Sequence, residues 1–275
     1  MKRLHIFGVA LLSGVLLAAC TTSPTGRSQL NLFSGNSLNA MGADAFAQIK
    51  QEEKISTNRE LNAYAQCVGN AIIEVLPAQY ANINWEIVVF ESDTINAFAL
   101  PGGHIGFYTG MMKLAENEHQ LAAVMGHEIG HVMANHSSER LSTNILISGL
   151  LLGADIAFSE RPPQQRAMLM AGLGVTTQLA VALPYSRTHE SEADEIGLDL
   201  MARAGFKPEE APKLWENMAA MGSGSTPELL STHPSPTSRI RALSQQVPRV
   251  QAYYEERVAA GLAPNCPRPA LLDRM

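Results

Sequence analysis

Apolar positions recur at helical intervals over much of this 275-residue chain. From Ser37 to Val75 they fall three and four residues apart, a spacing that predicts helix. The same spacing predicts further helices over 117–136, 188–204 and 235–246. Gly205 directly follows segment 188–204 and is a typical helix terminator. The pattern is therefore mainly helical.

Two short regions follow a different pattern. Apolar residues alternate with more polar neighbours over 83–89, which predicts a β-strand. Segments 96–100 and 105–108 flank Pro101-Gly102-Gly103, which predicts a hairpin. We therefore expect one α+β domain over residues 30–250, mainly helical with a small sheet.

Two other segments, 142–157 and 167–183, are strongly apolar. The first is short and ends near Asp155, and the second contains Thr176 and Gln178, so neither is a clean bilayer span of ~20 apolar residues. We expect buried helices of a globular domain. Contact with a membrane is the alternative.

The N-terminus has the pattern of an export signal. Lys2 and Arg3 precede an apolar stretch from Ile6 to Ala19. This stretch is short for a membrane span and typical of the apolar region of a secretory signal. Residues 1–19 are therefore expected to be a signal peptide.

The signal ends in Leu17-Ala18-Ala19-Cys20, which resembles a bacterial lipobox. Cys20 is then the expected lipidation site, and residues 20–29 are expected to form a flexible tether. Because Thr21 is not aspartate, the resemblance favours an outer-membrane lipoprotein facing the periplasm. An uncleaved anchor and an ordinary signal are the alternatives.

Composition narrows the function further. Hydrophobic residues make up 46% and charged residues 17%, an ordinary globular balance. A net charge of −6 with dispersed basic residues argues against nucleic-acid binding. Three cysteines are too few for a disulfide scaffold, but Cys67 and Cys266 are candidates for one bond in an oxidising compartment. Two free thiols are the alternative.

The clearest chemical motif is His127-Glu128-Ile129-Gly130-His131, an HExxH pattern within a predicted helix. The two histidines share one helix face, so both imidazoles can bind one Zn²⁺ ion. Glu128 can then accept a proton from bound water. His136 lies on a different face from His131 and is expected to be a packing or surface residue.

A catalytic zinc site needs a third protein ligand and one open position. Glu190 is the expected ligand, because Ala193 and Gly197 let its helix approach the first closely. Asp194 then reaches a ligand histidine and fixes its tautomer. Glu192 faces solvent in this arrangement, although Glu192 and His189 remain alternative ligands.

These motifs resemble the gluzincin proteases of peptidase family M48, which includes HtpX, the CAAX prenyl endopeptidase and the Oma-type proteases. The lipobox and the layout are most similar to periplasmic lipoproteins such as LoiP, YcaL and BepA. The resemblance also covers Asn96 to Gly103, the family's edge-strand hairpin, and His233-Pro234 with Arg239.

The resemblance implies a zinc endopeptidase with one Zn²⁺ per chain and extended or unfolded polypeptides as substrates. It implies that His233 assists the transition state and that Arg239 helps hold the site together. The edge strand of Ala97, Phe98, Ala99 and Leu100 would pair with the substrate. Residues 251–275 are expected to be a C-terminal tail.

The implied role is removal of misfolded envelope proteins. The rival interpretation is an assembly factor or chaperone for outer-membrane proteins, with a structural or latent zinc site and the assembly machinery as partner. A metal-binding or transport lipoprotein is a third interpretation.

Overall fold

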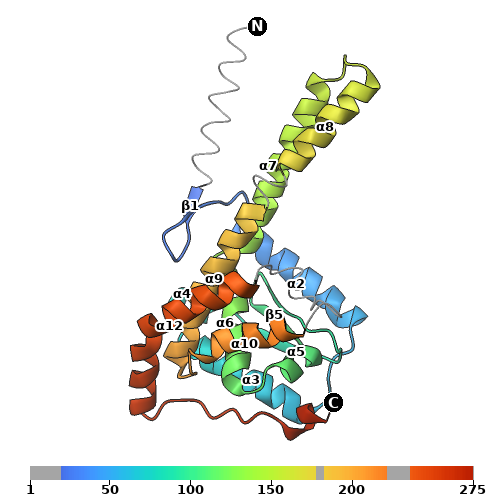
Figure 1. The fold of residues 1–275 in the computed structure, drawn as a ribbon. Coiled ribbons are helices and arrows are strands. Elements are labelled where there is room, and N and C mark those ends of the chain that lie inside the picture. The colour runs from blue at the N-terminus through green and yellow to red at the C-terminus, as the bar shows by residue number, and fades with distance from the viewer. Residues whose placement is uncertain (1–19, 178–182, 222–235, 275) are drawn as a thin grey trace.

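The computed structural model describes residues 20–177, 183–221 and 236–274. It confirms a mainly helical α+β fold with a small sheet (Figure 1). Within these ranges the strands are β1 (Cys20–Thr22), β2 (Ser28–Leu30), β3 (Glu86–Phe90), β4 (Ala97–Leu100) and β5 (His104–Tyr108). The helices are α2 (Gly35–Glu52), α3 (Arg59–Glu74), α4 (Ala78–Ala81), α5 (Thr109–Leu114), α6 (Glu118–Met133), α7 (His136–Ala157), α8 (Pro163–Thr177), α9 (Leu183–Ala204), α10 (Glu210–Ala220), α12 (Pro236–Ala259) and the 3-10 helix η3 (Ala270–Asp273).

The sheet has the strand order β3-β5-β4. β3 pairs with β5 in parallel, and β4 pairs with β5 antiparallel, so β4 lies at one edge. The predicted hairpin is confirmed. Gly102 and Gly103 have φ angles of 91° and 88°, which glycine adopts without the steric cost that other residues meet.

One hydrophobic core connects α3, the sheet, α6 and α9. Val68 of α3, Ile105 of β5 and Leu121 of α6 are all fully buried within it. Asn117 caps α6, since its side-chain oxygen accepts the N–H groups of His119 and Gln120 at 3.0 Å. The HExxH helix is therefore fixed at its start and along one face.

Helices α6 and α9 pack closely where small residues meet. Gly126 and Gly130 of α6 lie against Gly197 and Ala193 of α9. A Cβ added at Gly197 would lie 2.7 Å from the backbone nitrogen of His127, closer than real Cβ contacts. The close approach predicted from the small residues on α9 is thus present.

Helices α7 and α8 project away from the rest of the molecule (Figure 1). Burial of the apolar segments 142–157 and 167–183 was therefore a wrong prediction for the side chains that the structure describes. The two helices pack on each other but leave large apolar side chains exposed, among them Ile145, Leu150, Leu152, Ile156 and Met168. Along the described ranges no helix has the length and apolarity to cross a bilayer.

The segment expected to be a flexible tether is a hairpin instead. β1 and β2 pair antiparallel, with Thr21 opposite Gln29. Arg27 donates hydrogen bonds to Glu139 of α7 and Glu192 of α9. The flexible-tether prediction for 20–29 was wrong because buried carboxylates far along the chain bind this segment.

The C-terminal region also differs from expectation. α12 continues past the predicted end at Gln246 to Ala259, so the first residues of the tail expected over 251–275 belong to this helix. Pro248 lies inside this helix and costs about 3 kcal/mol there. Val250 is fully buried and Tyr253 stacks under Arg203, so packing offsets that cost.

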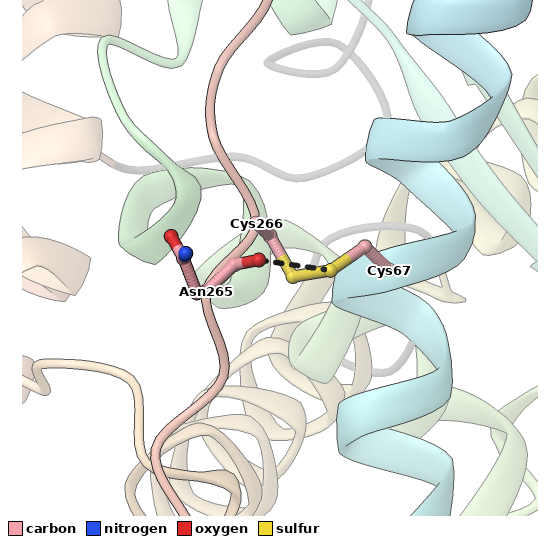
Figure 2. The surroundings of a disulfide bond; sticks show 3 residues. All are labelled: Cys67, Asn265 and Cys266. Atoms are coloured by element: carbon pink, nitrogen blue, oxygen red, sulfur yellow. Dashed lines mark hydrogen bonds between the residues drawn. A yellow bond between two sulfur atoms is a disulfide. The ribbon is translucent and has the colours of Figure 1, made fainter.

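A disulfide joins α3 to the C-terminal tail (Figure 2). It links Cys67 to Cys266, the pair that the sequence offered as candidates for one bond. Their Cα atoms lie 5.7 Å apart. Cys266 is fully buried and belongs to the hydrophobic core. The bond therefore attaches the tail to the core.

Candidate metal centre

Three predicted ligands converge between α6 and α9. The Nε2 atoms of His127 and His131 lie 3.0 Å apart, since the two residues are one helical turn from each other. The Glu190 carboxylate lies 3.4 Å from the Nε2 of His127 and 3.5 Å from the Nε2 of His131. All three side chains are buried.

This arrangement fits a zinc ion in both donor chemistry and size. Zinc prefers imidazole nitrogen and carboxylate oxygen at ~2.0–2.1 Å in a tetrahedron, which places ligand atoms about 3.3 Å from one another. The three observed separations, 3.0, 3.4 and 3.5 Å, lie around that value. Among the described residues the cluster has three members, which leaves one tetrahedral position for a fourth ligand.

The alternative third ligands point elsewhere. The Nε2 of His189 lies 2.9 Å from the Oε2 of Glu139. Glu192 lies 3.1 Å from the Nε2 of His136. Glu190 is therefore the member of its helix that meets the histidine pair.

His127 is supported by Asp194 and Arg239. The Nδ1 of His127 lies 3.0 Å from the Oδ1 of Asp194, and the Nε of Arg239 donates to the Oδ2 of Asp194 at 2.7 Å. Arg239 also donates to Glu190 at 3.0 Å and stacks 3.5 Å above the Trp215 ring. The structure thus brings Arg239 and Asp194 to the cluster, as expected.

Opposing influences act on the His127 imidazole. Burial and the charge of Arg239 lower its pKa, but hydrogen bonds to Asp194 and Glu190 outweigh them and raise the pKa to about 9. Burial raises the pKa of Asp194, but the charges and hydrogen bonds of Arg239 and His127 lower it by a larger amount. The net shift of this pKa is therefore downward. Because a metal binds neutral imidazole, protons and metal compete for this residue.

His131 is supported by His136, which the sequence did not predict. The Nδ1 atoms of the two rings lie 2.8 Å apart, and His136 is buried. Its assignment as a packing or surface histidine was wrong because the helix does not continue through it. Asn135 adopts a left-handed conformation with φ 54°, which ends α6 and turns His136 back towards His131.

The prediction that Glu192 faces solvent was also wrong. Its side chain is buried and contacts His136, Thr25 and Arg27. Helix geometry correctly separated Glu192 from Glu190, but a second buried region occupies the far side of the helix. Only the folded chain places the N-terminal hairpin there.

Sequence reasoning missed Arg27 and Glu139 altogether. Arg27 donates to both oxygens of Glu139 at 2.7 Å. Burial raises the pKa of Glu139, but hydrogen bonds from Arg27 and His189 outweigh it and lower the pKa to about 2. An arginine in a segment otherwise rich in Ser, Thr and Pro was the available signal.

Strand β4 forms an edge of the sheet, and among the described residues no strand pairs with its outer side. The N–H of Tyr108 donates to the carbonyl of Asn96 at 3.2 Å. Since antiparallel pairs alternate, the backbone N–H and C=O groups of Ala97 and Ala99 point away from β5.

A cleft of about 320 Å³ is lined by this edge and by one member of the cluster, His131. Residues 96–100 line one side, and Ser137 and Arg140 of α7 line another. Glu128 and His131 also line it, and Glu128 is otherwise buried. The cleft thus connects the extended edge of β4 to His131, one of the three clustered residues. His233, the remaining predicted site residue, lies outside the described residues.

Comparison with known proteins identifies a family and several relatives. Residues 59–247 match the profile described as Peptidase family M48. The chain is 34% identical over 220 residues to the mitochondrial metalloendopeptidase OMA1 of Schizosaccharomyces pombe, covering 78% of this chain and 62% of that protein. It is 30% identical over 236 residues to the human OMA1 metalloendopeptidase, covering 82% and 45%. It is 29% identical over 206 residues to the beta-barrel assembly-enhancing protease of Escherichia coli, covering 73% and 42%.

The chain spans less than two thirds of each of these relatives. The family match nevertheless covers more than half of the chain and includes the HExxH helix, Glu190 and Arg239. On this basis the chain belongs to peptidase family M48.

Proposed function

We propose that the protein is a zinc-dependent endopeptidase that cleaves extended or unfolded polypeptides. One observation supports this most strongly: the cleft that contains Glu128 and His131 also contains the open edge of β4. A structural metal site needs neither a neighbouring carboxylate nor a groove for a substrate strand.

His127, His131 and Glu190 would hold the zinc. When bound, zinc lowers the pKa of a coordinated water towards ~7 and polarises the scissile carbonyl. Asp194 accepts the Nδ1–H of His127 and so directs its Nε2 towards the ion. Arg239 compensates the buried charges of Asp194 and Glu190.

Glu128 is the general base in this proposal. It follows His127 directly in α6, lines the cleft and is 3% exposed. Its carboxylate accepts the proton of the attacking water and later delivers it to the leaving amine. His233 would donate a hydrogen bond to the developing oxyanion.

The substrate would bind as an added strand beside β4. Ala97 and Ala99 offer backbone donors and acceptors at the correct spacing for an extended peptide. Main-chain pairing tolerates many sequences, which suits a protease for misfolded proteins.

We further propose an envelope lipoprotein that faces the periplasm, anchored through Cys20. The lipobox-like end of the signal supports this location. The Cys67–Cys266 disulfide supports it too, since such bonds persist in oxidising compartments. Removal of damaged envelope proteins would be its role.

A role in outer-membrane assembly is the second candidate. It rests on similarity to the beta-barrel assembly-enhancing protease of Escherichia coli. In that case the zinc would be structural or latent, and Glu128 would have no role as a base.

Exchange of Glu128 for glutamine separates these functions. Glu128→Gln should retain one zinc per chain while the rate of casein cleavage falls by roughly 10²–10⁴-fold, because the general base is lost. Glu118→Gln, on the first turn of the same helix, is the matched control and should cleave at the wild-type rate. Wild-type cleavage by Glu128→Gln would refute the assigned base, and an inactive wild type with tightly bound zinc would favour the assembly role.

A further inference from the structure

Metal binding through the Nε2 of His131 determines whether its other ring nitrogen, Nδ1, carries a proton. Its Nε2 faces His127 and Glu190, at 3.0 and 3.5 Å. A neutral imidazole carries one N–H, and a ligating nitrogen carries none. The Nδ1 of His131 must therefore carry the proton when Nε2 binds a metal.

This proton fixes the state of the next ring. The Nδ1 of His131 lies 2.8 Å from the Nδ1 of His136, so His131 donates and His136 accepts. His136 then carries its own proton on Nε2, which lies 3.1 Å from the Oε2 of Glu192. A hydrogen-bonded chain thus runs from His131 through His136 to a buried carboxylate.

Arg27 holds the far end of that chain. Its Nε and Nη2 donate to the Oε2 of Glu192 at 2.9 and 2.8 Å. The same guanidinium donates to Glu139 of α7 at 2.7 Å. Both carboxylates are buried, so Arg27 compensates two negative charges from two different helices.

The N-terminal hairpin makes a second contact at the same place. Gln29 donates to Glu139 at 3.0 Å and to the carbonyl of Ala134 at 2.5 Å. Ala134 immediately precedes Asn135, where the left-handed turn brings His136 to His131. The hairpin therefore contacts both the carboxylate and the backbone turn that position His136.

The other histidine ligand, His127, is held by a similar hydrogen-bonded chain with fewer residues. His127 contacts Asp194 directly, and Arg239 holds Asp194. The support of His131 contains one additional ring, and its arginine comes from residue 27, outside the matched family region of 59–247. This second support is thus built partly from a segment beyond the matched protease region.

We propose that His136, Glu192 and Arg27 are positioning residues for the zinc ligand His131, and that docking of the N-terminal hairpin sets the affinity of the metal site. This inference rests on the proposed zinc site and extends it to the segment next to Cys20. The hairpin is a part of the metal centre and does more than connect an anchor to a domain.

Zinc affinity tests the inference without relying on peptidase activity. We expect the full chain carrying Arg27→Gln, Glu192→Gln or His136→Phe to bind zinc about 10–100-fold more weakly in competition with a fluorescent chelator. Arg249→Gln is the matched control for Arg27, because Arg249 pairs with Glu195 of the same helix α9 at 3.6 Å. His119→Phe, also on α6, is the control for loss of a histidine.

Two further measurements separate positioning from general destabilisation. Glutamine can accept from His131 and donate to Glu192, so His136→Gln should recover part of the affinity that His136→Phe loses. Because Arg27 and His136 act through one chain, the double variant should bind zinc about as weakly as the weaker single variant.

The outcomes are distinguishable from those of the proposed function. Zinc affinity of Arg27→Gln within twofold of the wild type would overturn this inference alone. Fully additive losses in the double variant would overturn it as well. A wild type that bound no zinc would overturn the proposed function and this inference together.

Discussion

The buried carboxylates around α6 and α9 have different neighbours, and these neighbours distinguish their tasks. Asp194 is paired with Arg239, and Glu139 with Arg27 and His189. Glu190 faces two imidazoles, whereas Glu128 faces the cleft. The same carboxylate group can therefore serve as a metal ligand, a base or a structural partner, depending on the residues around it.

Glu190 is the residue on which metal retention depends. Glu190→Ala should lose zinc, because two imidazoles alone leave the site without its carboxylate ligand. Glu195→Ala, on the same helix and half-exposed, should retain one zinc per chain. Metal content after gel filtration, measured by atomic emission, distinguishes them, and equal content would exclude Glu190 as the ligand.

The Glu139 charge predicts acid sensitivity. Its pKa is about 2 in the fold against an ordinary value of 4.5, so its ionised form stabilises the fold above pH 4.5 and that contribution is lost as pH falls towards 2. Burial lowers the pKa of His136 to about 4, so folding also excludes a proton there and stability falls between pH 6.5 and 4.

Urea unfolding of the metal-free protein should show both effects. The free energy of unfolding should fall by about 2 kcal/mol or more between pH 6.5 and 3.5. The profile should be shallower below pH 4.5 in Arg27→Gln, since Arg27 no longer holds the pKa of Glu139 down. An unchanged profile in that variant would contradict the pairing.

At the scale of elements, the crossing of α6 and α9 decides whether the site exists. The small residues that allow this crossing can be recognised in the sequence, and so can the helical spacing that aligns His127 with His131. Exposure of α7 and α8 is not readable in this way. Apolar content measures what a helix would gain from burial, but not whether a partner is present.

Two helical glycines make a matched test of that crossing. Gly197→Ala should lower the free energy of unfolding and weaken zinc binding, because its Cβ would meet the backbone of α6 at 2.7–2.8 Å. A Cβ added at Gly172 in α8 would have no atom within 4 Å. Gly172→Ala should therefore be neutral, or stabilise the fold by up to ~1 kcal/mol because alanine has the higher helix propensity. Equal effects of the two substitutions on thermal unfolding and zinc affinity would refute the crossing constraint.

At the scale of the whole molecule, contacts between residues distant in sequence hold the N-terminal hairpin and the C-terminal tail to the rest of the fold. The hairpin of residues 20–30 meets α7 and α9, and the tail meets α3 through the disulfide. The two bonded cysteines are 199 positions apart. The unfolded chain is therefore strongly restricted by this one bond.

Removal of the disulfide should destabilise the fold without altering the metal site. The double variant Cys67→Ser/Cys266→Ser should lose about 2–5 kcal/mol of unfolding free energy in urea. Its zinc affinity should stay within twofold of the wild type, because neither cysteine contacts a ligand. Reductant should destabilise the wild type similarly and leave the variant unaffected; a stable reduced wild type would contradict the prediction.

The sequence by itself determined what depends on local spacing. The HExxH pair, the hairpin at Pro101-Gly102-Gly103 and the small residues on α9 all follow from helix and strand periods. These periods are fixed by backbone geometry, so residues a few positions apart can be placed relative to one another. The approach of Glu190 to the histidine pair follows from the same rules together with one assumed helix contact.

Only the tertiary structure decided which distant charges meet. Arg27, Glu139 and Glu192 lie far apart in sequence, and no local period relates them. The turn at Asn135 depends on the contacts on both of its sides, so the position of His136 could not be derived from helix geometry. Burial of a charge requires a compensating partner, and the folded chain alone determines where that partner lies.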